Sequence, residues 1–227
     1  MKPYILCTLL ALALVSCVSE NEQKGLDYIG SIYDAKTSYS KSFDSELGSE
    51  TVKKFNIKVS ESSRIDSLQP TVTTANIAWL MYESFSADEK ENYTHVDVEL
   101  ISTKNDTASF YYPVDVLETL GKKAINFKAF SQNLVDRDFV KIDALKDDKE
   151  IPASLAVGLK NKIVQMEQQL GKLVGYEPFG ISEVKDDLGA AYQFQGYLVF
   201  EKGAYKPFLT VIDVAPGKDK LIGFKIF

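Results

Sequence analysis

The spacing of apolar residues predicts a first α+β unit over residues 26–116. Apolar positions at helical spacing indicate a short helix over 26–36 and a longer helix over 71–85, where Thr71 to Thr74 offer N-caps. Other segments alternate apolar and polar residues between turn residues, which is typical of strands joined by short connections. These segments form two predicted strand pairs, 36–43 with 51–60 and 94–102 with 108–112.

A second predicted unit, residues 117–227, begins with helices. Asp115 to Glu118 has the form of a capping box, and apolar residues continue at three-to-four spacing as far as Leu134. Gly121 interrupts this pattern early, which favours a regular helix that begins after it. A second amphipathic pattern, at 155–173, is the clearest in the chain.

The remainder of the second unit is predicted to be strands separated by glycine-containing turns. The short connections favour an antiparallel meander of four strands, at 173–184, 190–200, 205–214 and 221–227. Helices followed by such a meander resemble the NTF2-like folds of the cystatin-like superfamily. Phe127–Phe139 resembles the first helix of these folds and the acidic-aromatic corner after it, and Phe208–Phe227 resembles their last hairpin.

The NTF2-like resemblance covers the second unit only, and it implies two helices packed on a curved antiparallel four-stranded sheet. It also implies a conical cavity between the helices and the sheet. Cavities of this kind serve isomerases, dehydratases, small-ligand binders and dimer interfaces, so the fold does not choose among these functions.

The N-terminal segment has the form of a secretory signal, because a basic start at Lys2 precedes an apolar run over 4–15. This run is too short to span a membrane, which takes about 20 apolar residues. Leu14-Val15-Ser16-Cys17 resembles the lipobox of bacterial lipoproteins. The resemblance implies a signal peptide over 1–16 and acyl chains, such as palmitate, on Cys17.

The lipobox resemblance places the mature chain on a bacterial cell envelope. Val18, next to the cysteine, resembles the residues that direct lipoproteins to the outer membrane. The polar residues that follow predict a flexible lipidated tether over 17–25. The alternative is an ordinary signal peptide in which Cys17 occurs by accident.

Charge and cysteine content restrict the chemistry further. The net charge of −6 disfavours nucleic acid as a partner, and it disfavours electrostatic adhesion to anionic lipid. Cys7 leaves with the signal and Cys17 carries the lipid, so the mature body has no thiol or disulfide. His95 is the single histidine. The sequence therefore predicts no cofactor and no metal site.

Three groups of ionisable residues are candidate functional sites, and each also has a structural interpretation. Asp213 lies in an apolar strand and would be a general base in a cavity, although a solvent-facing carboxylate is the favoured interpretation. His95 and Asp97 share one strand face, where a solvated pair is favoured over a catalytic dyad. The third candidate is an acidic run whose interleaved lysines favour a solvated surface over a calcium loop, at Asp136, Asp138, Asp143, Asp147 and Asp148.

Aromatic residues and modification signals complete the list of candidates. Trp79, the only tryptophan, lies off the apolar stripe of its helix and is expected to pack against a second element or to line a groove. Ser67 and Thr107 each follow an aspartate and precede an aliphatic residue, which resembles the O-glycosylation acceptor of some Gram-negative envelopes. The aromatic side chains of the last strands are expected to be core or a ligand surface: Tyr192, Phe194, Tyr197, Phe200, Tyr205 and Phe208.

The sequence favours a lipid-anchored binding or assembly module of the cell envelope without catalytic activity. Its expected partners are the membrane, through the acyl chains, and an unknown protein or small apolar ligand. An enzyme that uses Asp213 in an NTF2-like cavity is the first alternative. A partner protein that neutralises toxins or responds to envelope stress is the second.

Overall fold

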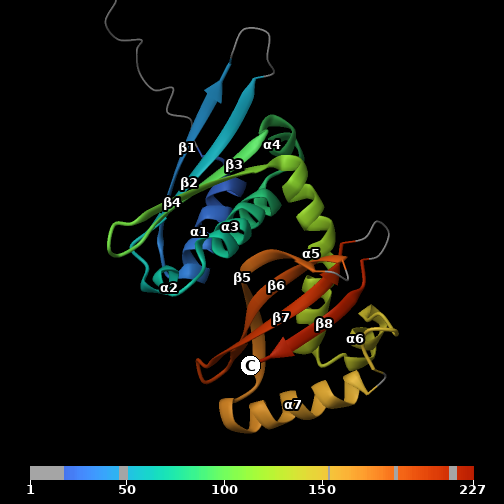
Figure 1. The fold of residues 1–227 in the computed structure, drawn as a ribbon. Coiled ribbons are helices and arrows are strands. Elements are labelled where there is room, and N and C mark those ends of the chain that lie inside the picture. The colour runs from blue at the N-terminus through green and yellow to red at the C-terminus, as the bar shows by residue number, and fades with distance from the viewer. Residues whose placement is uncertain (1–17, 46–50, 153, 187–188, 215–218) are drawn as a thin grey trace, which may run out of the picture.

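A computed structural model describes residues 18–45, 51–152, 154–186, 189–214 and 219–227 (Figure 1). It contains helices and two four-stranded sheets, so the predicted α+β class is confirmed. The first sheet (sheet A) has the strand order β1-β2-β3-β4, and the second (sheet B) has the order β5-β6-β7-β8. Among the described residues, no helix has both the length and the hydropathy needed to cross a bilayer.

Sheet A combines the two predicted strand pairs. β1 pairs antiparallel with β2, and β3 pairs antiparallel with β4, as expected. The two pairs join through a parallel contact of β2 with β3, which the helices between these strands make possible. The elements of this unit are α1 Glu20–Tyr33, β1 Lys36–Asp44, β2 Val52–Ser60, α2 Ser63–Asp66, α3 Pro70–Ser84, α4 Ala87–Asn92, β3 His95–Ile101 and β4 Thr107–Pro113.

Helix α1 begins earlier than the sequence pattern predicts. Ser19 accepts a hydrogen bond from the backbone N–H of Glu22, and the Glu22 carboxylate accepts one from the Ser19 N–H, which forms a capping box. Residues 20–25 are therefore helical, and the prediction of a flexible tether over 17–25 is wrong for them. Cys17 itself lies outside the described residues.

One face of sheet A is apolar and is covered by α1 and α3 (Figure 1). The strand alternation puts Phe55 and Ile57 of β2 and Val96 and Val98 of β3 on this face, where all four are buried. The opposite face carries polar side chains that include His95 and remain partly exposed.

Sheet B is an antiparallel meander, as predicted. Its core face packs against α5, where the Phe127 ring stacks on Phe194 at 5.4 Å and on Phe208 at 5.8 Å between centroids. A short third helix, α6, lies between the two that the pattern predicts. The elements are α5 Val114–Asp136, α6 Phe139–Leu145, α7 Leu155–Leu170, β5 Leu173–Asp186, β6 Gly189–Phe200, β7 Tyr205–Asp213 and β8 Leu221–Ile226.

Two predicted helix starts are wrong. Helix α5 begins at Val114 after Pro113, without the capping box expected from Asp115, and it continues through Gly121. A Cβ at Gly121 would lie 2.9 Å from the Glu83 carboxylate, a contact that the flexible Glu83 side chain could relieve. Helix α3 begins at Pro70, and Thr71 to Thr74 lie inside it instead of capping it.

The two units share one continuous apolar core. Helix α3 lies between the sheets and contacts both β3 and β5. Its Trp79 ring packs edge-on against Phe194 of β6, with 6.3 Å between centroids, and is 1% exposed. The predicted boundary between residues 116 and 117 falls inside α5, so this helix belongs to both units.

Candidate functional site

A pocket of about 270 Å³ opens where the two units meet, between α1, α3, α5 and β5. We call it the junction pocket. Its walls include five ring side chains, one or more from each of these four elements: Tyr28, Trp79, Phe127, Tyr176 and Pro178. Concave, mostly apolar sites with a few polar groups are the usual form of small-molecule binding sites. Trp79 both packs against a second element and lines the pocket, as the sequence predicts.

Three charged side chains also line the junction pocket, and each has a partner of opposite charge. The ammonium group of Lys128 pairs with the Glu83 carboxylate and lies 5.0 Å from the centre of the Trp79 ring. The ammonium group of Lys24 lies 2.6 Å from the Glu20 carboxylate on the helix surface. The charges around the pocket therefore balance.

Two phenol groups, those of Tyr28 and Tyr176, are uncharged polar groups in the pocket wall. Burial, helped by the neighbouring Tyr176 and Glu177, raises the pKa of Tyr28 to about 12. Burial also raises the pKa of Tyr176. Both phenols therefore keep their protons at neutral pH, and neither has a hydrogen-bond partner among the described residues. The two phenols can donate hydrogen bonds to a ligand.

Buried hydrogen bonds hold the β5 wall in place. Asn76 of α3 donates from Nδ2 to the Tyr33 hydroxyl at 2.8 Å and to the Pro178 carbonyl at 3.1 Å. The Tyr33 hydroxyl donates to the Phe179 carbonyl at 2.9 Å, next to an irregularity of β5 between Pro178 and Gly180. We call Asn76, Tyr33 and these carbonyls the neutral cluster. Sequence reasoning missed it, although an asparagine within the apolar stretch of α3 was a usable signal.

A charged cluster fixes the other end of α1. Glu22 is 1% exposed, and its carboxylate accepts from Lys41 Nζ at 2.9 Å, from the Tyr93 hydroxyl at 2.7 Å and from the Ser19 N–H at 2.8 Å. Burial and the bond to Glu22 raise the pKa of Tyr93. Sequence reasoning missed this cluster too, although Ser19-x-x-Glu22 is a capping-box pattern.

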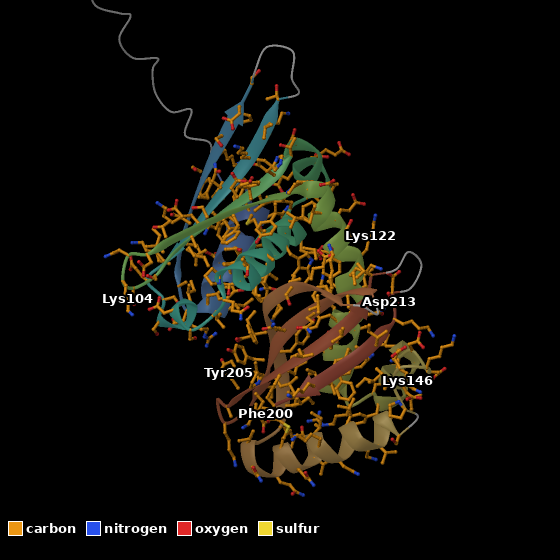
Figure 2. The ribbon with its side chains drawn as sticks, viewed as in Figure 1. Lys104, Lys122, Lys146, Phe200, Tyr205 and Asp213 are labelled. Carbon is orange, nitrogen blue, oxygen red and sulfur yellow. The ribbon has the colours of Figure 1, made fainter. Side chains whose placement is uncertain are left out.

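Asp213 does not line the junction pocket. Figure 2 shows it at the end of β7, where it pairs with Ala191 of β6. Ile212 beside it is buried against the helices, so the alternation of the strand directs Asp213 to the opposite face of the sheet. Asp213 is half-buried at this position and lies outside the junction pocket.

His95 and Asp97 lie on the polar face of sheet A, as their strand positions predict. No hydrogen bond joins their side chains within the described residues, and a ring nitrogen of His95 lies 3.0 Å from the Thr94 hydroxyl instead. Partial burial raises the pKa of Asp97, one of whose carboxylate oxygens has no partner among the described residues. Asp97 therefore does not orient the imidazole.

The acidic run supplies caps and ion pairs. Asp138 accepts from the backbone N–H of Lys141 at the start of α6. The ammonium of Lys146 lies between the carboxylates of Asp143, at 3.4 Å, and Asp148, at 2.8 Å. Lys146 is 5% exposed, so the prediction of a solvated surface is wrong for this residue. Among the described residues, no group of three acidic or histidine side chains could hold a metal ion.

The two predicted glycosylation acceptors lie near one another. Ser67 and Thr107 are both exposed, one after α2 and the other at the start of β4. The Asp66 carboxylate, next to Ser67, accepts hydrogen bonds from the backbone and hydroxyl of Thr103 in the turn before Thr107. The structure thus brings both acceptors to one corner of sheet A.

The aromatic residues of the last strands divide between the two faces of sheet B. Phe194, Phe200 and Phe208 are buried in the core, as the structural interpretation predicts. Tyr205 is 42% exposed on the opposite face, where the Arg64 guanidinium lies 5.5 Å from its ring (Figure 2). Tyr192 and Tyr197 lie on opposite faces of β6, as expected.

The fold and the pocket define the chain as an α+β protein with a ring-lined pocket between two units. Comparisons with family models, curated proteins and solved structures find no match for the chain. The lipobox and the NTF2-like resemblance therefore stay predictions.

Proposed function

We propose that this protein is a lipid-anchored binding module of the bacterial cell envelope and not an enzyme. The observation that carries the proposal is the order Leu14-Val15-Ser16-Cys17 behind a short apolar run. Several acyl chains on Cys17 would hold the body on a membrane without a basic surface, because each buried methylene contributes about 0.8 kcal/mol. Val18 favours the outer membrane.

The junction pocket supports binding over catalysis. Its carboxylate, Glu83, is paired with Lys128, and its two phenols are protonated at neutral pH, so the pocket presents neither a free base nor an activated nucleophile. Its ring walls offer apolar contact area and few polar groups, which suits a small apolar ligand. The acidic chain disfavours nucleic acid as a partner.

Detergent phase partitioning of the Cys17→Ala variant tests the anchor. We expect the wild-type chain in the detergent phase and the variant in the aqueous phase, because the variant cannot be acylated. Cys7→Ala, within the apolar run, is the matched control and should partition like the wild type.

The same preparation allows an intact-mass measurement. An N-terminal acylated Cys17 supports the proposal, and a free thiol at Cys17 contradicts it. An additional hexose-type mass that disappears in Ser67→Ala or Thr107→Ala would support glycosylation at these sites, and an unmodified mass would end that prediction.

A further inference from the structure

We infer that the junction pocket binds a small, uncharged, planar ring compound that carries a hydroxyl or carbonyl group. This inference names the ligand of the binding function proposed above and rests on it. It follows from the charge balance of the pocket, from its ring walls and from its two phenols, which have no hydrogen-bond partner in the part of the chain that the structure describes.

The charges exclude cationic and anionic ligands in turn. Ring-lined pockets can bind cations, but here the Lys128 ammonium already lies over the Trp79 ring, where a cationic ligand would otherwise bind. An anion that binds Lys128 would displace Glu83 and would then leave this carboxylate partly buried without its partner. An uncharged ligand disturbs neither pair.

The ring side chains of the pocket wall favour a flat ligand. Rings from four elements surround the space, and flat ring compounds pack against such side chains by stacking or edge contacts. An apolar cavity of about 150 Å³ is large enough for benzene. The junction pocket, at about 270 Å³, therefore has room for one or two rings.

The two tyrosine hydroxyls in the pocket wall favour a ligand that carries a hydrogen-bonding group. Tyr28 and Tyr176 both line the pocket and lie close enough that Tyr176 helps to raise the pKa of Tyr28. Protonated phenols donate and accept hydrogen bonds. A hydroxyl or carbonyl group on the ligand edge can therefore form hydrogen bonds with them.

Trp79 makes the pocket directly observable because it is the only tryptophan of the chain. The full mature chain is reconstituted in phosphatidylcholine vesicles and titrated with 4-bromophenol, whose bromine quenches tryptophan fluorescence on contact. We expect saturable quenching with half-saturation below about 1 mM. The charged analogues 4-bromobenzoate and 4-bromobenzylamine should bind at least about tenfold more weakly, because each must disturb a paired charge.

Two variants test the phenols. Tyr28→Phe and Tyr176→Phe each remove one hydroxyl, and we expect each to weaken the binding of 4-bromophenol about two- to tenfold. Tyr111→Phe is the matched control, because Tyr111 is 75% exposed on sheet A and should leave the titration unchanged. Linear, unsaturable quenching would overturn the inference. So would equal binding of all three probes, or a double Tyr28→Phe/Tyr176→Phe variant that binds like the wild type.

The two experiments distinguish a chain that is not anchored to the membrane from a chain that does not bind this class of ligand. A chain that stays in the aqueous phase on partitioning contradicts lipid anchoring, and the titration is then carried out on the same chain without vesicles. A chain that partitions into detergent but fails the titration is anchored and does not bind this class of ligand.

Discussion

Helix α1 is held at its two ends by buried polar clusters of opposite kinds. At its start, the Glu22 carboxylate binds the Lys41 ammonium and the Tyr93 hydroxyl, so this cluster is charged. At its end, Tyr33 binds Asn76 and a carbonyl of β5, so this cluster is neutral. Glu22 of the charged cluster follows the proposed anchor by five positions in the sequence, and the neutral cluster supports the wall of the junction pocket.

The comparison shows how each kind of cluster specifies structure. Glu22 accepts three hydrogen bonds, and loss of any partner leaves a buried charge less well compensated. Asn76 donates two bonds, but its own side-chain oxygen has no partner among the described residues. The neutral cluster therefore specifies how β5 packs on α3. We expect its disruption to lower the free energy of unfolding by less than disruption of the charged cluster.

The largest expected effect comes from Glu22→Ala. The substitution leaves the Lys41 ammonium, whose side chain is 15% exposed, without its buried partner. We expect the free energy of unfolding to fall by about 3–5 kcal/mol. Urea denaturation measures this change. Glu20→Ala, which removes an exposed carboxylate two residues earlier in the same helix, is the control and should be indistinguishable from wild type.

A double variant separates charge from packing at the same position. Glu22→Leu with Lys41→Met replaces the ion pair by apolar side chains of similar size, and it should recover most of the stability that Glu22→Ala loses. If the double variant is as unstable as Glu22→Ala, the cluster acts through its hydrogen bonds and not through its charge pairing.

Asn76→Ala is expected to have the second-largest effect. It leaves the Pro178 carbonyl and the Tyr33 hydroxyl each one donor short in a buried site, which costs about 2–3 kcal/mol. Denaturation with urea again provides the measurement, and Asn92→Ala, at the exposed end of α4, is the control with an effect below about 0.5 kcal/mol. If Asn76→Ala lowers the free energy of unfolding by more than Glu22→Ala, the neutral cluster contributes more to stability than the charged one, contrary to our expectation.

Local patterns predicted most of the fold. The strands of both sheets were predicted because alternation and turn residues are contained within each segment, as in β3 and β8. The parallel contact of β2 with β3 was not predicted, because nothing in either strand shows which neighbour it takes. The start of α5 was missed because a capping-box pattern at Asp115 competed with Pro113, which begins the helix.

The site could be predicted only in part. Trp79 stood out because it lies off the apolar stripe, and the structure places it in the pocket wall. The clusters at the ends of α1 depend on partners far apart in the sequence: Glu22 and Tyr93 are 71 positions apart, and Tyr33 and Phe179 are 146 apart. No local pattern carries such pairings, although the capping-box pattern Ser19-x-x-Glu22 was a local signal that the residues after it are helical.

The smallest expected effect is a loss of stability at alkaline pH. Burial raises the pKa of Tyr33, and burial together with the bond to Glu22 raises the pKa of Tyr93, above the unfolded value of 10.0. Above pH 10 the unfolded chain loses these protons while the folded chain keeps them, so stability is fully present below pH 10 and falls as pH rises. For the fully buried Tyr33 the loss at pH 11 is at most about 1.4 kcal/mol.

Tyr93→Phe shows which cluster carries this dependence. The variant should be less stable than wild type at pH 8, because Glu22 loses a donor, but it should lose less stability between pH 8 and pH 11. Tyr111→Phe, at an exposed position, should follow the wild-type curve. Lysines titrate in the same range in all three chains, so their contribution cancels in the comparison. Parallel curves for wild type and Tyr93→Phe would show that Tyr93 does not carry the alkaline sensitivity, which would then belong to the other tyrosines whose pKa burial raises, such as Tyr33 and Tyr28.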